Sequence, residues 1–243
     1  MTAWLLALDT STPRTALALG RVDRDRGAAE LIAHATHDDA GPASALLGPR
    51  IAALLAEAGV AAAELGAIAC GRGPGMFTGC RVALATAKGL ALALGCPIFG
   101  LSTLAVIAGS AEGTAFALLD ARRGEVYAAT FAVGEAGPAR LSEDRCCTLE
   151  QALADMSPET LAAIRPVGPG VAAHGAALPP ELRARALATA GADARGLWRA
   201  AARAALREAA DDVAALDAVY LRASYAELGL NTPKRPPFRS PFV

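Results

Sequence analysis

Two aspartates in this sequence each close an apolar run and offer candidates for phosphate chemistry. Asp9 ends the run Trp4–Leu8 and is followed by Thr10 and Ser11, and Asp120 ends a second apolar run. Hydroxyl side chains and backbone N–H groups at such a turn can meet a phosphate, while the carboxylate serves a metal ion or a water. Aspartate also caps strand turns in proteins that bind nothing there. The residues alone leave both interpretations open.

A glycine-rich segment is the second candidate. Gly71, Gly73 and Gly75 precede a proline-free stretch that runs from Gly79 to Leu94. Free N–H groups at the start of a helix can hold a phosphate. The segment lacks the Lys–Ser/Thr pair of a Walker A loop and the glycine spacing of a dinucleotide fingerprint. Spacing alone therefore favours a structural turn over an anion site.

Metal-ligating residues are scarce. The chain has three histidines, and His34 and His37 stand three apart, followed by Asp38 and Asp39. These four residues could form a metal cluster, but they fall on a predicted strand end and loop, where this spacing does not align two ligands. We expect ordinary surface residues here and no metal site.

The elements that must position these residues follow from hydrophobic periodicity and turn signals. Strands are predicted over 4–8, 15–19, 29–36, 67–70 and 97–100, and helices over 44–58 and 79–94, the latter with Thr78 as N-cap and Gly95 as C-cap. The second half repeats the strand–aspartate–turn–strand unit over 115–120 and 126–133, which suggests an internal duplication. The predicted fold class is α/β, with an N-terminal lobe over 1–108, a smaller lobe over 109–225 and a proline-rich tail over 226–243. Helix 197–210 is a candidate for packing back on the first lobe.

Composition narrows the function classes. Hydrophobic residues make up 53% of 243 residues and the net charge is −1, so the chain can bury a large core but has no general attraction to nucleic acid. Any RNA contact would need a local arginine patch or a partner's surface. Five cysteines without zinc spacing indicate reduced thiols in a cytosolic protein. The apolar run Val82–Leu94 contains Lys88 and is too short to span a bilayer, so we expect a soluble, cytoplasmic chain.

Several motifs together resemble one known family, TsaB. They occur in order along the chain: Leu6–Thr12, Gly71–Gly79, Ala87–Ala91, Leu119–Tyr127 and Val219–Arg222. The resemblance implies an actin-like, sugar-kinase-like and Hsp70-like fold with two duplicated α/β lobes. It also implies a non-catalytic dimerisation subunit of the bacterial machinery that places threonylcarbamoyl on the adenosine beside the anticodon of ANN-decoding tRNAs.

The resemblance further implies partners. The chain would bind the catalytic relative TsaD, the ATPase TsaE would join, tRNA would be met only through the complex, and no cofactor would be needed. A homodimer is a possible state of the chain alone. A transferase of this kind needs two histidines one turn apart on a helix, and helix 44–58 has none, which favours the non-catalytic assignment. Ala43 stands where many family members carry histidine.

The same resemblance assigns residues. Partner-binding residues are expected on two helices: Leu47, Ile51, Leu54, Leu55, Gly79, Val82, Ala83, Thr86, Ala87 and Leu90. A glycine loop with a vestigial nucleotide site is expected from Asp9, Thr10, Ser11, Gly71, Gly73, Gly75 and Asp120. An alanine-rich helix that packs only inside the chain would show the same pattern, so the small-residue face does not by itself decide between core and interface.

A rival function belongs to another class. An active ATP-dependent enzyme of the same fold would use Asp9 and Asp120, and would lose its ATP turnover in Asp9→Ala. The missing metal ligands and the poorly marked segment around Gly168 and Gly170 argue against it. A metalloprotease lacks any zinc-binding pair and is discounted.

Overall fold

The first lobe is built on a five-stranded mixed sheet. A computed structural model describes residues 2–38 and 42–222; the tail predicted over 226–243 and Asp39 lie outside them. The sheet order is β3-β2-β1-β4-β5, with β1 antiparallel to β2 and parallel to β4. Its strands are β1 Thr2–Asp9, β2 Thr15–Asp23, β3 Ala28–His37, β4 Leu65–Gly71 and β5 Ile98–Leu101.

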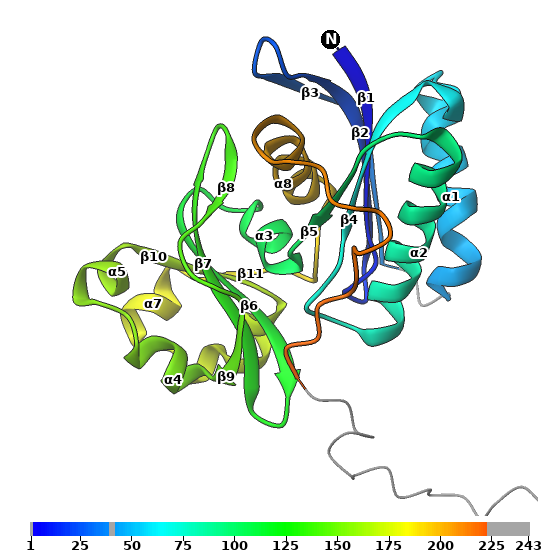
Figure 1. The fold of residues 1–243 in the computed structure, drawn as a ribbon. Coiled ribbons are helices and arrows are strands. Elements are labelled where there is room, and N and C mark those ends of the chain that lie inside the picture. Colours follow the sequence, from blue (N-terminus) through cyan, green and yellow to red (C-terminus); the bar gives the residue numbers. More distant parts are fainter. Residues whose placement is uncertain (1, 39–41, 223–243) are drawn as a thin grey trace, which may run out of the picture.

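The second lobe repeats this plan. Its sheet has the order β11-β10-β6-β7-β8, and β9 pairs with β7. The strands are β6 Gly113–Arg122, β7 Glu125–Gly134, β8 Gly137–Arg140, β9 Arg145–Thr148, β10 Ile164–Gly168 and β11 Leu187–Ala188. In the first lobe β1 is antiparallel to β2 and parallel to β4. In the second lobe β6 is likewise antiparallel to β7 and parallel to β10. The shared order and directions confirm the duplicated α/β fold that the sequence predicts (Figure 1).

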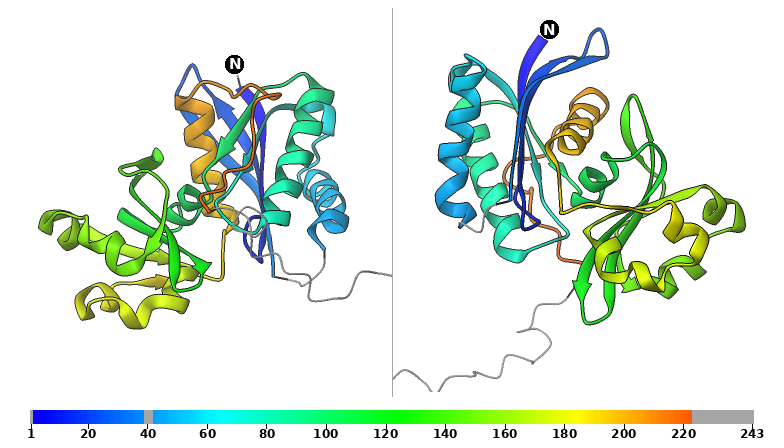
Figure 2. Two further views of the ribbon diagram at one scale, coloured as in Figure 1. Left: turned by 60° about the horizontal axis from the view of Figure 1, so that its bottom comes forward. Right: turned by 180° about the vertical axis from the view of Figure 1, so that it is seen from behind.

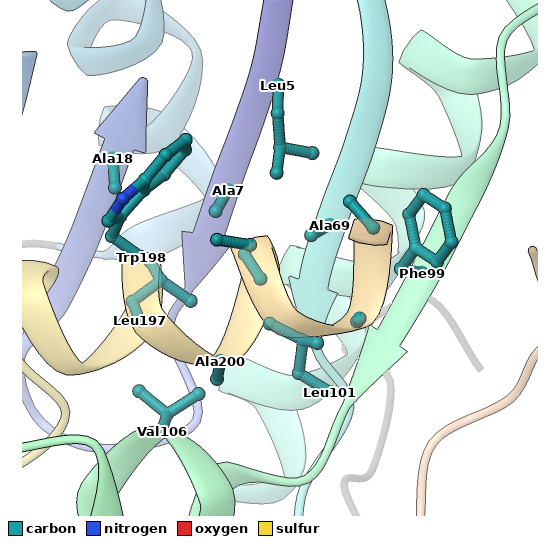
Figure 3. Close-up of a cluster of buried hydrophobic side chains, with 14 of the residues drawn as sticks. Leu5, Ala7, Ala18, Ala69, Phe99, Leu101, Val106, Leu197, Trp198 and Ala200 are labelled. Carbon is teal, nitrogen blue, oxygen red and sulfur yellow. The ribbon is translucent and has the colours of Figure 1, made fainter. Parts of the chain in front are cut away.

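Helices cover both faces of the first sheet. The helices α1 (Ala43–Glu57) and α2 (Phe77–Leu94) lie on one face, where they share a core with the apolar side chains of β1 and β4. The helix α8 (Ala194–Arg207) lies on the other face, against Leu5, Ala7 and Phe99 (Figure 3). A short helix η1 (Ala62–Glu64) leads into β4.

The second sheet has its own helical layer. The helix α3 (Thr103–Ala108) packs against one face and also touches α8, so it joins the lobes. The other face holds Phe116 and Leu118 in a cluster with residues of the segments beyond β9. Those segments form α4 Leu149–Ala154, α5 Pro158–Ala163, α6 Pro169–His174, η2 Gly175–Ala177 and α7 Pro180–Ala184.

The helix α8 follows the second lobe in sequence but packs on the first. Its Trp198 is buried and stands over Gly20, where an added Cβ would come within 2.4 Å of the indole ring. The guanidinium of Arg199 donates to the backbone oxygens of Gly109, Ala111 and Gly134. Both lobes therefore hold this helix, and it fills the space between them in two views (Figures 1 and 2). The lobe boundaries at 108 and 225 stay a prediction.

The ends of α2 differ in part from expectation. The N-cap is Met76, without a side-chain hydrogen bond, so the prediction of Thr78 as N-cap is wrong, because Thr78 already lies in the first turn. Gly95 adopts the left-handed conformation at the C-cap, as predicted. At 18 residues the helix is long and apolar enough, by length and composition, to cross a membrane. The apolar run predicted from Val82 was therefore shorter than the helix that contains it. One of its faces is buried against the chain's own sheet.

Candidate functional site

The turn after β1 is closed around Asp9. Asp9 and the three residues that follow it are almost fully buried. Oδ1 of Asp9 accepts hydrogen bonds from the backbone N of Ser11 at 2.7 Å and from its hydroxyl at 2.5 Å. Oδ2 is buried and has no hydrogen-bond partner among the described residues. Burial raises the pKa of Asp9 above its ordinary value, against the lowering effect of the bonds from Ser11.

The glycine loop lies directly on this turn. A Cβ atom added to Gly71 would come within 1.9 Å of Oδ2 of Asp9, and one added to Gly75 within 2.3 Å of the carbonyl oxygen of Ser11. At Gly79 the added atom would meet the carbonyl oxygen of Thr10 at 1.8 Å. Gly75 and Gly79 are therefore required because two backbone segments touch there, and Gly71 because the Asp9 carboxylate lies against it.

Hydrogen bonds join the loop to the turn. Thr10 Oγ1 donates to the carbonyl of Gly79 at 2.7 Å, and the backbone N of Met76 donates to the carbonyl of Ser11 at 2.7 Å. The Ser11 hydroxyl lies 2.7 Å from that of Thr103 at the start of α3. The hydroxyls of Thr10 and Ser11 and the N–H groups of Ser11 and Met76 thus already have partners in the chain itself.

The matching turn of the second lobe has a different environment. Oδ1 of Asp120 accepts from the backbone N of Arg122 at 2.9 Å and lies 3.1 Å from Nε2 of His174. Partial burial acts to raise the pKa of Asp120, but these bonds and the nearby charges outweigh it and lower that pKa. Arg122 and Arg123 have φ of 67° and 56°, a left-handed pair that non-glycine residues rarely adopt.

Sequence reasoning missed His174 as the partner of Asp120. The two residues lie 54 positions apart, and His174 is at the end of a short helix that the sequence did not predict. A lone histidine carries no sequence signal for such a pair. The structure shows it only because β6 and α6 are adjacent in the fold.

The two aspartates do not share an open cleft, because Asp9 is fully buried under the glycine loop. His34 and His37 both lie in β3, and their odd spacing places them on opposite faces of the strand. Within residues 2–38 and 42–222, no group of three histidine, cysteine, aspartate or glutamate side chains could hold a metal ion. All five cysteines are free thiols.

Most of the expected partner-binding residues lie inside the chain. Those on α1 are buried beneath that helix, and three of those on α2 are buried as well: Leu47, Ile51, Leu54, Leu55, Gly79, Ala83 and Ala87. They face the chain's own sheet and not the solvent, and their role in partner binding stays a prediction. The small residues of α2 let it approach its own β1 turn. Val82, Thr86 and Leu90 are half-buried and remain at the edge of the outer surface.

The outward surface of these helices uses neighbouring positions. On α2 it carries Ala85, Gly89 and Leu92, of which Leu92 is 65% exposed. On α1 it includes Gly48 and Ala52, and a Cβ added to Gly48 or Gly89 would meet nothing within 4 Å. We call these five residues the outer helix face. Sequence reasoning missed it because alanine and glycine occur on both sides of each helix.

Comparisons with known proteins agree on one family. The sequence model of TsaD, tRNA N6-adenosine threonylcarbamoyltransferase, matches residues 42–167. TsaB of Escherichia coli, a tRNA threonylcarbamoyladenosine biosynthesis protein, is 39% identical over 94 residues, which cover 37% of this chain and 41% of that protein. An uncharacterized protein of Mycobacterium tuberculosis is 36% identical over 137 residues, covering 56% of this chain and 63% of that protein.

A solved structure matches across nearly the whole chain. YeaZ from Pseudomonas aeruginosa superimposes with a TM-score of 0.75 at 30% identity, covering 90% of this chain and 100% of that one. The aligned sequence segments span less than two thirds of the curated relatives, whereas the structural match spans all of YeaZ. With its duplicated lobes and its TsaD-like segment, the chain belongs to the TsaB/YeaZ family, which is related to TsaD.

Proposed function

We propose that this chain is a non-catalytic scaffold subunit in the formation of threonylcarbamoyladenosine on tRNA. It acts in the cytoplasm by binding a TsaD-type catalytic subunit, with a TsaE-type ATPase joining the assembly, and it meets tRNA within that complex. The relatives named TsaB are described as tRNA threonylcarbamoyladenosine biosynthesis proteins, which supports the pathway. The observation that carries the non-catalytic role is the buried carboxylate of Asp9.

A catalytic carboxylate has to reach its substrate, water or metal ion. Asp9 is fully buried, and Gly71 of the glycine loop lies directly against its Oδ2. A buried carboxyl group without a charged partner is also driven toward its neutral form, which binds a metal ion poorly. An ATP-dependent enzyme that uses Asp9 and Asp120 together is therefore disfavoured.

The outer helix face is the proposed docking surface for the catalytic subunit. Small side chains at Gly48, Ala52, Ala85 and Gly89 allow close approach of a partner helix, and Leu92 supplies exposed apolar area. Because TsaD is a relative with the same kind of lobe, the two chains can pair these helices around an approximate two-fold axis. A homodimer of this chain would use the same surface in the absence of its partner.

The test is complex formation between the purified chain and the TsaD-type subunit of the same organism. Ala85→Arg places a long charged side chain on an exposed position of α2 and is expected to abolish co-elution in gel filtration. Ala163→Arg, at an exposed position of α5, is the control and should co-elute like the unmodified chain. The reconstituted threonylcarbamoylation of an ANN-decoding tRNA should fail with Ala85→Arg and proceed with the control.

Two results would contradict the proposal. If the chain and the TsaD-type subunit do not co-elute at micromolar concentration, the scaffold role is wrong. If Ala85→Arg co-elutes normally, the outer helix face is not the docking surface. If the isolated chain hydrolyses ATP and Asp9→Ala abolishes this activity, the chain is an ATP-dependent enzyme.

A further inference from the structure

The outward side of α8 carries a row of arginines, of which Arg195 and Arg207 are exposed and Arg199 and Arg203 are half-buried. Arg195, Arg199, Arg203 and Arg207 recur every fourth residue, so they lie on one side of the helix. Nearly all the remaining side chains of α8 are buried against the two lobes, and Leu206 is half-buried. We call these four residues the arginine line.

The physics of the helix itself does not account for this line. Like charges four residues apart repel each other, and the line contains three such pairs. Arg195 lies in the first turn, where the helix dipole favours an acidic residue; the acidic residue at this end is the N-cap, Asp193, whereas Arg207 in the last turn is favoured by the dipole. A mixture of glutamate and arginine would have solvated the same face and stabilised the helix.

The four arginines have different roles inside the chain. Arg199 is structural, since it pairs with Glu112 at 2.8 Å and donates to three backbone oxygens. The guanidinium groups of Arg195, Arg203 and Arg207 form no hydrogen bond or ion pair with any other residue in the described parts of the chain. Three cationic groups on one line are thus available to a ligand.

The line borders a series of hollows between the lobes. Arg203 lies on a cleft of about 540 Å³ that also exposes Arg72 and Arg140. Arg203 and Arg207 border a second hollow, beside the turn of the β2–β3 hairpin, and Arg195 borders a third. Figure 1 shows α8 between that hairpin and β8. Carboxylates line these hollows as well: Glu135, Glu143, Asp144, Asp193 and Glu208. Asp144 pairs with Arg140 at 2.5 Å.

We propose that the arginine line binds the phosphate backbone of an RNA strand. Four residues of helix rise about 6 Å, so Arg203 and Arg207 stand at a spacing close to that of successive phosphates, and Arg195 lies about 12 Å before Arg203, over about 18 Å in all. A polyanion with its charges in a row matches this row of cationic groups. A net charge of −1 gives the whole chain no general affinity for nucleic acid, so RNA binding requires a local group of cations such as this line. The choice of RNA among polyanions rests on the proposed function.

The experiment measures binding of an unmodified ANN-decoding tRNA transcript by fluorescence anisotropy. It uses the chain alone at low salt and the chain in complex with the TsaD-type subunit. The variant replaces Arg195, Arg203 and Arg207 by Gln and leaves Arg199 in place. The charge-matched control replaces three solvent-accessible arginines of the second lobe by Gln: Arg145, Arg165 and Arg183.

The expected result is binding at least about tenfold weaker in the arginine-line variant. The slope of log affinity against log salt should become shallower by about one for each phosphate that the variant no longer neutralises. The control should bind like the unmodified chain. Glu143→Gln should tighten binding, an opposite effect that a purely structural role of the line does not predict. The thermal midpoint of the variant should be unchanged or higher, because repulsion along α8 is relieved.

The outcomes separate this inference from the proposed function. If the variant and the control bind the transcript equally, the RNA contact is wrong, even where co-elution with the TsaD-type subunit stands. If the variant no longer co-elutes but keeps RNA binding, the line is a protein contact and the inference is overturned. If the unmodified chain fails to co-elute yet the variant shows the expected weakening of RNA binding, the scaffold role falls and the RNA contact stands.

Discussion

A Cβ atom added to Gly71 would lie 1.9 Å from Oδ2 of Asp9. Two segments that are 62 positions apart are therefore interlocked at the ends of adjacent parallel strands, β1 and β4. In the sequence, each segment looks like part of a phosphate site. In the fold, the glycine loop fills the space beside Asp9, and the Asp9 turn fills the space beside the glycine loop. The contact between the two segments therefore serves packing.

The glycines of α2 provide a matched test of this joint. Gly79→Ala would push a methyl group against the carbonyl oxygen of Thr10, which belongs to the backbone and cannot move cheaply. We expect a loss of about 1–3 kcal/mol in the free energy of unfolding. Gly89→Ala, on the same helix with nothing within 4 Å, should gain up to about 1 kcal/mol. Urea denaturation followed by circular dichroism measures both. Equal effects of the two substitutions would show that the loop does not press on the turn.

Asp9 should make the protein less stable as the pH rises. Burial raises its pKa in the folded state, so the folded protein favours the protonated form more than the unfolded chain does. The stability gained from that proton is complete below the unfolded pKa, near 3.9, and is lost as the pH rises through the folded value. Asp9→Asn keeps the acceptor for Ser11 but cannot ionise. It should be more stable than the unmodified protein at pH 8, with the difference shrinking toward pH 4.

Unfolding free energies from urea titrations between pH 4 and pH 8 would measure that difference. The opposite trend, in which Asp9→Asn loses stability relative to the unmodified protein between pH 4 and pH 8, would mean that the carboxylate has a partner in the folded state. Ser11→Ala is a useful companion, because it removes one bond that lowers the pKa of Asp9 and should steepen the loss of stability with pH.

Asp120 should show the opposite dependence. Its pKa is lowered in the folded state, because the bonds from Arg122 and His174 outweigh partial burial. The stability it contributes is present above the unfolded pKa and is lost as the pH falls through the folded value. Asp120→Asn should therefore be less stable than the unmodified protein at pH 7, and the two should converge toward pH 2. Nuclear magnetic resonance titration of the Asp120 carboxyl carbon checks the direction, and an apparent pKa above 4 would contradict it.

Much of the fold follows from local signals, and the site does not. The repeated strand–Asp–turn–strand unit predicts both lobes, since alternation and turn residues act over a few positions, and Ser102 caps α3 through its hydroxyl as its sequence suggests. The short strands β8, β9 and β11 were missed because four or fewer residues carry little periodicity.

The orientation of α2 shows why the rest could not be predicted. Gly79, Ala83 and Ala87 form a small-residue stripe that fits a partner helix or the chain's own sheet equally well. The structure places the stripe inward because the β1 turn needs room for the carbonyl oxygen of Thr10. That requirement comes from a segment 69 positions away, and no window of local sequence contains it.

Trp198 should anchor α8 to the first lobe. Its ring is 7% exposed and lies against β1 and β2, where Gly20 leaves space for it (Figure 3). Trp198→Ala removes this contact and leaves a cavity, so we expect a loss of about 3–5 kcal/mol in unfolding free energy. Because that is a large share of the stability of a typical domain, Trp198→Phe serves as a milder variant with a smaller loss of the same sign.

Leu92→Ala, at a mostly exposed position, is the control and should change stability by less than about 0.5 kcal/mol. Urea denaturation followed by far-ultraviolet circular dichroism measures all three, since tryptophan fluorescence would change with the substitution itself. If Trp198→Ala and Leu92→Ala unfold alike, then α8 is not held to the first sheet by this ring, and its place between the lobes depends on Arg199 and its bonds to the second-lobe backbone instead.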